Sequence, residues 1–188
     1  NQIDLADCAR KGIAVFNAPF ANTRSVVELV LGEMIMLSRK IFDKSGKMHQ
    51  GIWEKSSEGV HEIRGKKLGI VGFGNIGSQL SVLAENLGMQ VYFYDVLDKL
   101  ALGNAKRVHS LSELLKTVDF VSVHVDGRSE NTNLFGEKEF KVMKDGVIFI
   151  NTSRGFVIDI KSLVKYLKSG KVRGAAIDVF PKEPFAAN

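Results

Sequence analysis

The sequence is poor in cysteine and lacks a long apolar run, and each absence excludes a class of protein. Its single cysteine, Cys8, can form neither an internal disulfide nor a cysteine zinc site. Charged residues interrupt the longest apolar stretch, residues 26–41, which falls short of the roughly 18 uninterrupted apolar residues of a membrane-spanning helix. The first residues also lack the charged and apolar regions of a secretory signal. We therefore expect a soluble, cytoplasmic protein that contacts no membrane.

The charge balance is positive, but no segment concentrates it. The 188 residues include 26 lysines and arginines against 21 aspartates and glutamates, a net charge of +5. Because the basic residues are scattered, we expect no nucleic-acid partner, and an anionic cofactor or substrate explains the balance as well. With 45% hydrophobic and 25% charged residues, the chain suits one globular domain or at most a small two-domain protein. Since it starts at Asn1 rather than at a methionine, we expect it to be part of a longer chain.

Short apolar strands and helices alternate along most of the sequence. This alternation predicts an α/β fold with a doubly wound parallel sheet of Rossmann type, covered by helices on both faces. Residues 49–64 have no sustained period and are expected to form a loop. Strands are expected at residues 13–16, 67–71, 90–94, 120–125, 147–150 and 174–179, and helices at residues 5–10, 25–37, 76–87, 111–117, 137–143 and 160–169.

The long helix near the start of the chain has two notable features. Ser25 and Glu28 have the S-x-x-E spacing of a capping box, which predicts that the helix begins at Ser25. Apolar residues then occupy nearly every face of residues 26–37, more than one buried stripe explains. The helix is therefore expected either to be central or to pack against a second subunit.

A glycine motif follows the strand at residues 67–71 and opens the next helix. In Gly72-Phe-Gly74-Asn-Ile-Gly77, Gly72 permits a tight turn, Gly74 lets the backbone approach a pyrophosphate, and Gly77 allows close packing of helix and strand. The helix N-terminus then favours the negative charge. Such glycines alone can be mere turn residues, but the strand and helix around them favour dinucleotide binding.

Asp95 supports this interpretation because it ends the next strand, about 20 residues after the glycines, where an acid binds the adenosine ribose hydroxyls. The alternative is a turn residue at a strand end. A carboxylate there repels the 2′-phosphate of NADP, and Val96 and Leu97 offer no arginine to receive it. NAD is therefore the expected cofactor. No G-x-x-x-x-G-K-[ST] motif supports a nucleotide triphosphatase.

Further polar residues follow the later strands, where ligands bind in doubly wound sheets. Arg154, in the stretch Asn151-Thr-Ser-Arg-Gly155, is expected to point its guanidinium into the crevice, ready for a substrate carboxylate, unless it is a plain surface arginine. Asp178 is a candidate for cofactor contact and Glu183 for orienting a catalytic imidazole, although either can be a turn acid.

The four histidines offer no convincing catalytic acid or base. His124 lies within an expected strand, where a packed core histidine is the favoured interpretation, and the other three lie in loops or before a helix. No two histidines are three or four residues apart, so we expect no metal site.

Together these motifs resemble the D-isomer-specific 2-hydroxyacid dehydrogenase family over essentially the whole chain. The stretches that carry the resemblance are Asn17-Ala-Pro19, Asn22-Thr-Arg-Ser-Val26, residues 65–77, Asn151-Thr-Ser-Arg-Gly155, Ala176-Ile-Asp-Val-Phe180 and Pro181-Lys-Glu-Pro184. Residues 91–95 and 102–105 are similar to the branch that oxidises D-3-phosphoglycerate to 3-phosphohydroxypyruvate, the first step of serine biosynthesis. Another D-2-hydroxyacid, or an NAD-sensing binding protein without catalysis, remains an alternative.

The resemblance implies that residues 1–188 are an NAD-binding domain whose substrate-binding domain lies elsewhere in a longer protein, with a small 2-hydroxyacid as the substrate. It also implies a homodimer formed through the cofactor domains. The cofactor-binding positions that it implies, besides the glycines, are Asn75 and Ile76 for the pyrophosphate, Asp95 for the ribose, Thr152 and Ser153 for the nicotinamide side, and Asp178 for the cofactor as well.

For catalysis, the resemblance implies that Arg154 binds the substrate carboxylate and that Glu183 pairs with a catalytic histidine. In the family this histidine follows the glutamate by some twenty residues, beyond Asn188. One stretch departs from the pattern: Val125-Asp-Gly127 replaces the proline that the family usually has after this strand.

Overall fold

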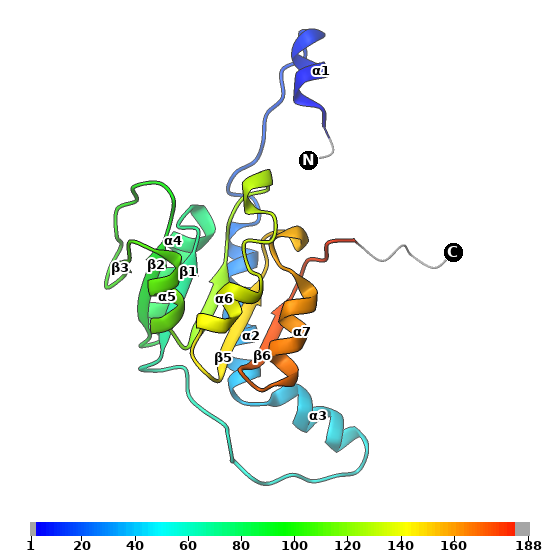
Figure 1. Cartoon of the computed structure of the whole chain (residues 1–188), viewed down its shortest axis with the longest axis vertical. Helices are drawn as coiled ribbons and strands as arrows, with labels where there is room; N and C mark the ends of the chain where they lie inside the picture. The colour runs from blue at the N-terminus through cyan, green and yellow to red at the C-terminus, as the bar shows by residue number, and fades with distance from the viewer. Residues whose placement is uncertain (1–2, 183–188) are drawn as a thin grey trace.

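The computed structural model describes residues 3–182, and its centre is a six-stranded, entirely parallel sheet in the order β3-β2-β1-β4-β5-β6 (Figure 1). Since every neighbouring pair is parallel, each connection returns the chain from the carboxyl end of one strand to the amino end of the next. A helix lies in each of these connections except the one between β2 and β3. The doubly wound Rossmann-type fold is thereby confirmed. The strands are β1 (Lys67–Val71), β2 (Gln90–Tyr94), β3 (Lys106–Arg107), β4 (Phe120–Val123), β5 (Val147–Asn151) and β6 (Val172–Ile177).

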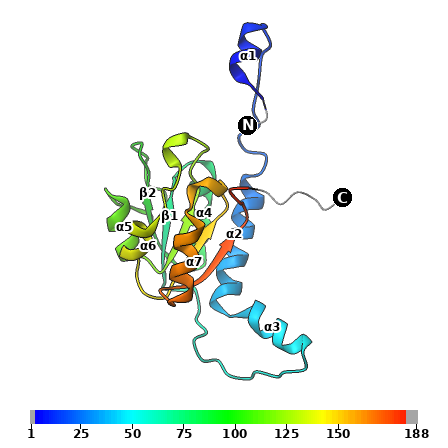
Figure 2. The same cartoon turned by 45° about the vertical axis from the view of Figure 1, so that its right-hand side comes forward.

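Helices cover both faces of the sheet, with α2 and α4 on one face and α5, α6 and α7 on the other (Figure 2). Two 3₁₀ turns, η1 (Ser129–Asn131) and η2 (Gly155–Val157), follow β4 and β5. The α-helices are α1 (Leu5–Arg10), α2 (Thr23–Ser38), α3 (Ile41–His49), α4 (Asn75–Asn86), α5 (Leu111–Thr117), α6 (Glu137–Val142) and α7 (Ile160–Lys168). Within the described residues, no helix combines the length and the apolar character that crossing a membrane requires.

The strand period of two divides the core into two layers, one on each face. In β5, Ile148 and Ile150 face α2 and α4, whereas Val147 and Phe149 face α5, α6 and α7, and all four are buried. A strand whose first four residues are all apolar and all buried, as in β5, therefore belongs inside a sheet covered on both sides.

The strand order reverses beside β1, which pairs with β2 on one side and with β4 on the other. The two connections leave β1 and β4 in opposite directions, so a crevice opens beyond their carboxyl ends. The glycine motif lies at this crevice, because Gly74 is the N-cap of α4 directly after β1.

Two expectations for the N-terminal part are wrong. Residues 13–16 form no strand, because no neighbouring strand pairs with them. The helix α2 begins at Thr23, with Asn22 as its N-cap, and not at Ser25. The capping box does not form, because Arg24 Nε binds Glu28 Oε1 at 2.6 Å.

The sequence also missed two elements, the helix α3 and the short edge strand β3. Lys40 precedes α3 in a left-handed conformation (φ 53°), a break that the apolar pattern does not reveal. The expected loop is found after α3. The other expected helices and strands are confirmed with ends that differ by at most two residues, which is the usual uncertainty of such ends.

The apolar surface of α2 is divided between a buried and an open face. Val27, Val30 and Met34 are fully buried, with Thr23 and Ser38 continuing the same stripe. The opposite side keeps apolar residues open, because Leu29 and Ile35 are 41% and 40% exposed. The helix is thus not central, and its outer face exposes apolar side chains.

Candidate functional site

Two glycines bring the β1–α4 turn close to its surroundings. Gly72 has φ 94°, and a Cβ at this position would lie 2.6 Å from the carbonyl oxygen of His124 after β4. A Cβ at Gly77 would overlap the carbonyl oxygen of Gly72. These contacts agree with the packing roles that the motif predicts, a tight turn and close approach of helix to strand.

Gly74 has a different surrounding, because a Cβ there would meet no atom within 4 Å. It caps α4 without a side-chain hydrogen bond, so the first N–H groups of the helix face open space. Asn75 and Ile76 supply these N–H groups, whereas the Asn75 side chain donates from Nδ2 to the carbonyl oxygen of Pro19 at 3.1 Å. The open helix N-terminus suits a pyrophosphate.

Asp95 lies at the end of β2, beside this turn. Its Oδ2 accepts the N–H of Phe73 at 2.7 Å and its Oδ1 accepts the N–H of Leu97 at 2.8 Å. These bonds fix the carboxylate while leaving lone pairs for ribose hydroxyls. Asp95, Gly72 and Gly74 all line one hollow of about 370 Å³, to which Arg128 and Asn131 contribute from the opposite side.

His124 lies at the inner end of the same hollow. Its Nε2 lies 2.8 Å from Ser122 Oγ, and its Nδ1 is buried without a hydrogen-bond partner. Burial lowers the pKa of His124 from 6.5 to about 4, so the ring is neutral at physiological pH. The packed histidine expected from the sequence is what the structure contains.

This buried ring makes stability depend on pH. The folded-state pKa of His124 lies below its unfolded-state value, so the unfolded chain takes up a proton first as the pH falls from 6.5 towards 4. Stability is therefore full well above pH 6.5 and decreases below it, by about 2–3 kcal/mol at pH 4.5. Urea unfolding of the wild type and of His124→Gln at pH 7.5 and 4.5 measures this, and the stability difference between them should shrink at pH 4.5. Parallel pH profiles would contradict the prediction.

The turn after β5 holds the second group of candidates. Asn151 is buried, and its Oδ1 accepts from Ser153 N at 3.0 Å and from Ser153 Oγ at 2.6 Å, while its Nδ2 donates to the carbonyl oxygen of Arg154 at 3.1 Å. Thr152 Oγ1 is buried without a partner, and Arg154 Nη1 donates to the carbonyl oxygen of Ser153 at 2.7 Å. An unpartnered hydroxyl in an ordered turn is what a polar ligand group would satisfy.

The segment after β6 lies directly against this turn. A Cβ at Gly155 would overlap the backbone of Phe180, and Asp178 N donates to the carbonyl oxygen of Asn151 at 3.1 Å. The structure thus brings Asp178 to the same edge of the sheet as Thr152, Ser153 and Arg154. Glu183 lies outside the described residues.

Glu33 on α2 is a polar residue of this region that the sequence did not identify as a site residue. Its Oε2 is buried without a partner. Burial and, second, the charge of Asp178 raise the pKa of Glu33 from 4.5 to about 7. The sequence did carry a signal for this residue, because Glu33 is a lone carboxylate within an otherwise apolar part of the helix.

No group of three or more His, Cys, Asp or Glu side chains among residues 3–182 is arranged to hold a metal ion.

A family model described as "D-isomer specific 2-hydroxyacid dehydrogenase, NAD binding domain" matches residues 31–188. The chain belongs to this family. Its cofactor is NAD, and the residues present fit this dinucleotide. The open helix N-terminus at Gly74 suits the pyrophosphate, the Asp95 carboxylate suits the ribose, and the unpartnered Thr152 hydroxyl suits the nicotinamide side.

The relatives of known name within the family include several D-3-phosphoglycerate dehydrogenases. The protein of that name from Haemophilus influenzae is 55% identical over 188 residues, which are 100% of this chain and 46% of the relative. The one from Escherichia coli K12 is 54% identical over 184 residues, 98% of this chain and 45% of the relative. The chain therefore spans about half the length of these family members.

Solved structures of the family agree with the fold. D-lactate dehydrogenase from Aquifex aeolicus, complexed with NAD and lactic acid, is 33% identical with a TM-score of 0.87, over 96% of this chain and 55% of that one. A glyoxylate reductase from Paecilomyes thermophila is 34% identical with a TM-score of 0.88, over 97% of this chain and 56% of that one.

Replacing Asp95 by alanine should weaken NADH binding about 10- to 100-fold, because the carboxylate would no longer accept hydrogen bonds from the ribose. The preference for NADH over NADPH should shrink as well, since the charge that repels a 2′-phosphate is removed. Calorimetric titration of the full-length protein with both cofactors measures the two effects. An unchanged preference in a variant that remains folded would show that Asp95 does not discriminate between the cofactors.

Proposed function

We propose that this chain is the cofactor-binding part of an NAD-dependent dehydrogenase that oxidises D-3-phosphoglycerate to 3-phosphohydroxypyruvate, the first step of serine biosynthesis. The observation that carries the proposal is that the Arg154 turn and the glycine turn lie beyond the carboxyl ends of strands of one parallel sheet. Arg154, which can bind a substrate carboxylate, thus lies at the same end of the strands as the cofactor site. The phosphorylated substrate follows from the names of relatives that are more than half identical.

In this proposal NAD, when bound, accepts a hydride from C2 of the substrate. Arg154 holds the carboxylate of the substrate beside the reacting carbon, because a guanidinium binds a carboxylate through two parallel hydrogen bonds. Its own Nη1 bond to the Ser153 carbonyl oxygen restrains the side chain before the substrate arrives. Glu183 would orient a histidine contributed by the rest of the protein, which takes the hydroxyl proton.

We infer further that residues 1–188 form the NAD-binding domain of a longer cytoplasmic protein whose substrate-binding domain lies outside this chain. The helix α1 supports the inference, because it has no buried residue and stands apart from the sheet (Figure 1). The segment that follows exposes Phe16 and Phe20. Apolar side chains left open in this way suit contact with the remainder of the protein.

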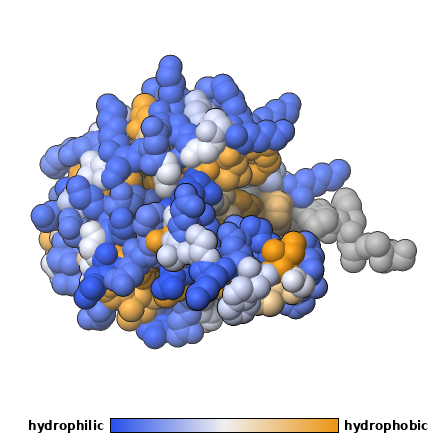
Figure 3. All heavy atoms as spheres, turned by 90° about the horizontal axis from the view of Figure 1, so that it is seen from below, coloured by the Kyte–Doolittle hydropathy of each residue, from blue (hydrophilic) through white to orange (hydrophobic). Residues whose placement is uncertain are grey.

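We also infer a homodimer formed through the cofactor domain. The outer face of α2, the helix α3 and the loop after it expose apolar side chains, and the underside of the molecule has an apolar hollow among polar residues (Figure 3). Such a surface is typical of an interface between subunits. The exposed apolar residues are Leu29, Ile35, Ile41, Phe42, Met48, Ile52 and Trp53.

The test of the proposed function is turnover by the full-length protein. We expect NAD-dependent oxidation of D-3-phosphoglycerate with a kcat/KM far above that for unphosphorylated D-2-hydroxyacids. The 188-residue chain by itself should bind NADH and turn over almost nothing, because in this proposal another part of the protein contributes the catalytic histidine. Preference for an unphosphorylated acid would assign the protein to another activity of the family, such as a glyoxylate or hydroxypyruvate reductase. Absence of turnover with any acid, together with NADH-dependent capture of a protein partner, would favour a non-catalytic NAD sensor.

A further inference from the structure

The loop after β4 contains a polar network that the glycine motif and the β5 turn do not use. Asp126 Oδ1 accepts three hydrogen bonds: from Arg128 Nε at 2.8 Å, from Arg128 N at 3.3 Å and from Asn131 Nδ2 at 3.0 Å. Asn131 Nδ2 also donates to the carbonyl oxygen of Asp126 at 3.0 Å. Hydrogen bonds from Arg128, and more weakly from Asn131, lower the pKa of Asp126, so its carboxylate stays ionised. The loop thereby holds the Arg128 side chain by its Nε.

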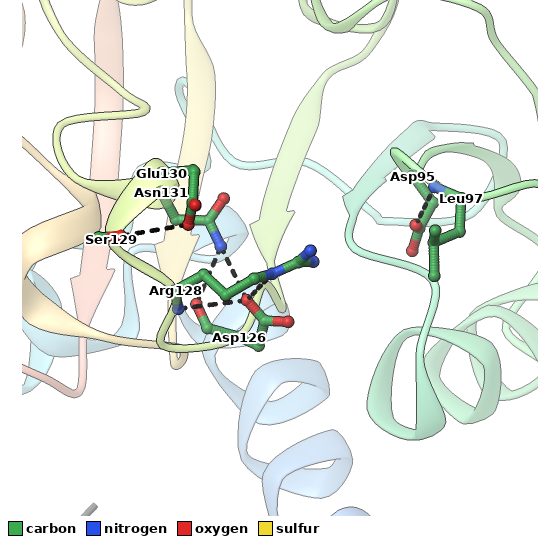
Figure 4. A network of polar contacts seen from close by, with 7 residues as sticks. All are labelled: Asp95, Leu97, Asp126, Arg128, Ser129, Glu130 and Asn131. Carbon is green, nitrogen blue, oxygen red and sulfur yellow. Dashed lines mark hydrogen bonds and ion pairs between the residues drawn. The ribbon is translucent and has the colours of Figure 1, made fainter.

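Held in this way, Arg128 extends towards the hollow that Asp95 lines from the other side. In Figure 4 the end of its guanidinium points across the gap towards Asp95 and Leu97. Its pKa is raised first by the hydrogen bond and charge of Asp126, and less by the charges of Glu130 and Asp95, which agrees with this placement. With Nε engaged by Asp126, the planar face of the guanidinium is left for a ligand.

The opposite wall of the hollow is apolar and open. Val96 and Leu97 directly follow Asp95 and are 67% and 55% exposed. Large apolar side chains this open, on the wall of a hollow, are available to be covered by a ligand. A flat group inserted here would have apolar side chains on one face and a guanidinium on the other.

We propose that Arg128 covers the adenine ring of NAD, closing it against Val96 and Leu97, and that Asp126 is the positioning residue for this cover. Guanidinium planes stack on aromatic rings, and adenine is a flat, uncharged ring of the required kind. The proposal rests on NAD binding and is independent of which acid the enzyme oxidises. It also gives a role to Asp126, which lies in the stretch Val125-Asp-Gly127 where the sequence departs from the family pattern.

The charges in the hollow favour adenine over the other group that an arginine could receive here, the 2′-phosphate of NADP. The carboxylate of Asp126 already neutralises Arg128, and the fixed carboxylate of Asp95 repels a phosphate on the ribose. A neutral ring meets neither obstacle.

The test is calorimetric titration of the full-length protein and its Arg128→Ala variant with NADH, ADP-ribose and NADPH. We expect the variant to bind NADH and ADP-ribose about five- to ten-fold more weakly, by the same factor for both, because both contain adenine. The ratio of NADH to NADPH affinity should not change. Arg128→Lys keeps the charge without the planar fork and should recover less than half of the loss on a logarithmic scale.

The matched control is Arg64→Ala. Arg64 also forms an ion pair with an acid two residues before it, Glu62, at 3.5 Å. It lies just before β1, at the amino ends of the strands, opposite the end where the cofactor site lies. This variant should bind all three ligands as the wild type does. An unchanged affinity of Arg128→Ala for ADP-ribose would overturn the proposal, and so would a loss confined to NADPH or full recovery by lysine. Thermal unfolding of each variant verifies that Arg128, an exposed residue, can be replaced without loss of the fold.

Discussion

Gly77→Ala is expected to lower the free energy of unfolding by about 2–3 kcal/mol and to nearly abolish NADH binding. The Cβ would overlap the carbonyl oxygen of Gly72, which is backbone and cannot rotate away as a side chain could. Gly77 is also buried between α4 and β1, so relief requires the helix to move off the sheet. Because α4 carries the N–H groups for the pyrophosphate, this movement displaces them as well. Urea unfolding and NADH titration of the variant measure the two losses.

Gly74→Ala separates the two effects and is the matched control. Its Cβ would meet no protein atom, and its φ of −85° is open to any residue, so stability should change by less than about 0.5 kcal/mol. The methyl group would however point into the space that we assign to the pyrophosphate, and NADH affinity should fall at least about ten-fold. Equal NADH affinities of Gly74→Ala and the wild type would mean that the pyrophosphate does not approach this turn.

Arg154→Gln in the full-length enzyme is expected to lower kcat/KM for the acid substrate about 10²- to 10³-fold. The substitution removes the charge and one of the two parallel hydrogen bonds to the carboxylate, and such charged pairs contribute several kcal/mol when water is excluded. NADH binding should change little, because Arg154 is exposed and its Nη1 bonds its own turn. Steady-state kinetics with titration of NADH distinguishes these outcomes.

Arg154→Lys is the informative companion because it keeps the charge but loses the planar fork. Substantial recovery of kcat/KM by lysine would indicate that charge alone binds the carboxylate. If Arg154→Gln instead weakened NADH binding as much as it lowered turnover, the residue would belong to the cofactor site, and the carboxylate role would be wrong.

The parts of the fold that sequence reasoning predicted well are those fixed by local periodicity. The strands β1 and β2 and the helix α5 have the predicted ends, because alternating or continuous apolar residues stop where turn residues begin. The glycine motif was equally informative, since close backbone contacts require glycine at Gly72 and Gly77, and the spacing of the motif is visible in a short stretch of sequence. Asp95 followed from its spacing relative to these glycines.

The failures have in common that contacts made only in the folded chain decide them. Residues 13–16 have the composition of a strand, but no other strand pairs with them. Ser25 and Glu28 have the spacing of a capping box, but the Glu28 carboxylate accepts a hydrogen bond from Arg24 instead. The position of Arg128 opposite Asp95 depends on how the loop after β4 folds against Asp126 and Asn131. The burial of Glu33 beside Asp178 depends on the packing of α2. No pattern along the chain displays these pairs.

The strand order also determines how this domain must fold. In a sheet without a single hairpin every strand pair closes a long loop, and β1, at the centre, pairs with β4 as well as with β2. Such long closures slow folding, and edges of incomplete sheets attract other chains meanwhile. The order of synthesis limits this exposure, because β1, α4 and β2 leave the ribosome together and can form a βαβ unit before β4 is made. The half that contains the glycine turn can therefore nucleate the sheet, and the half that contains Arg154 adds to it later.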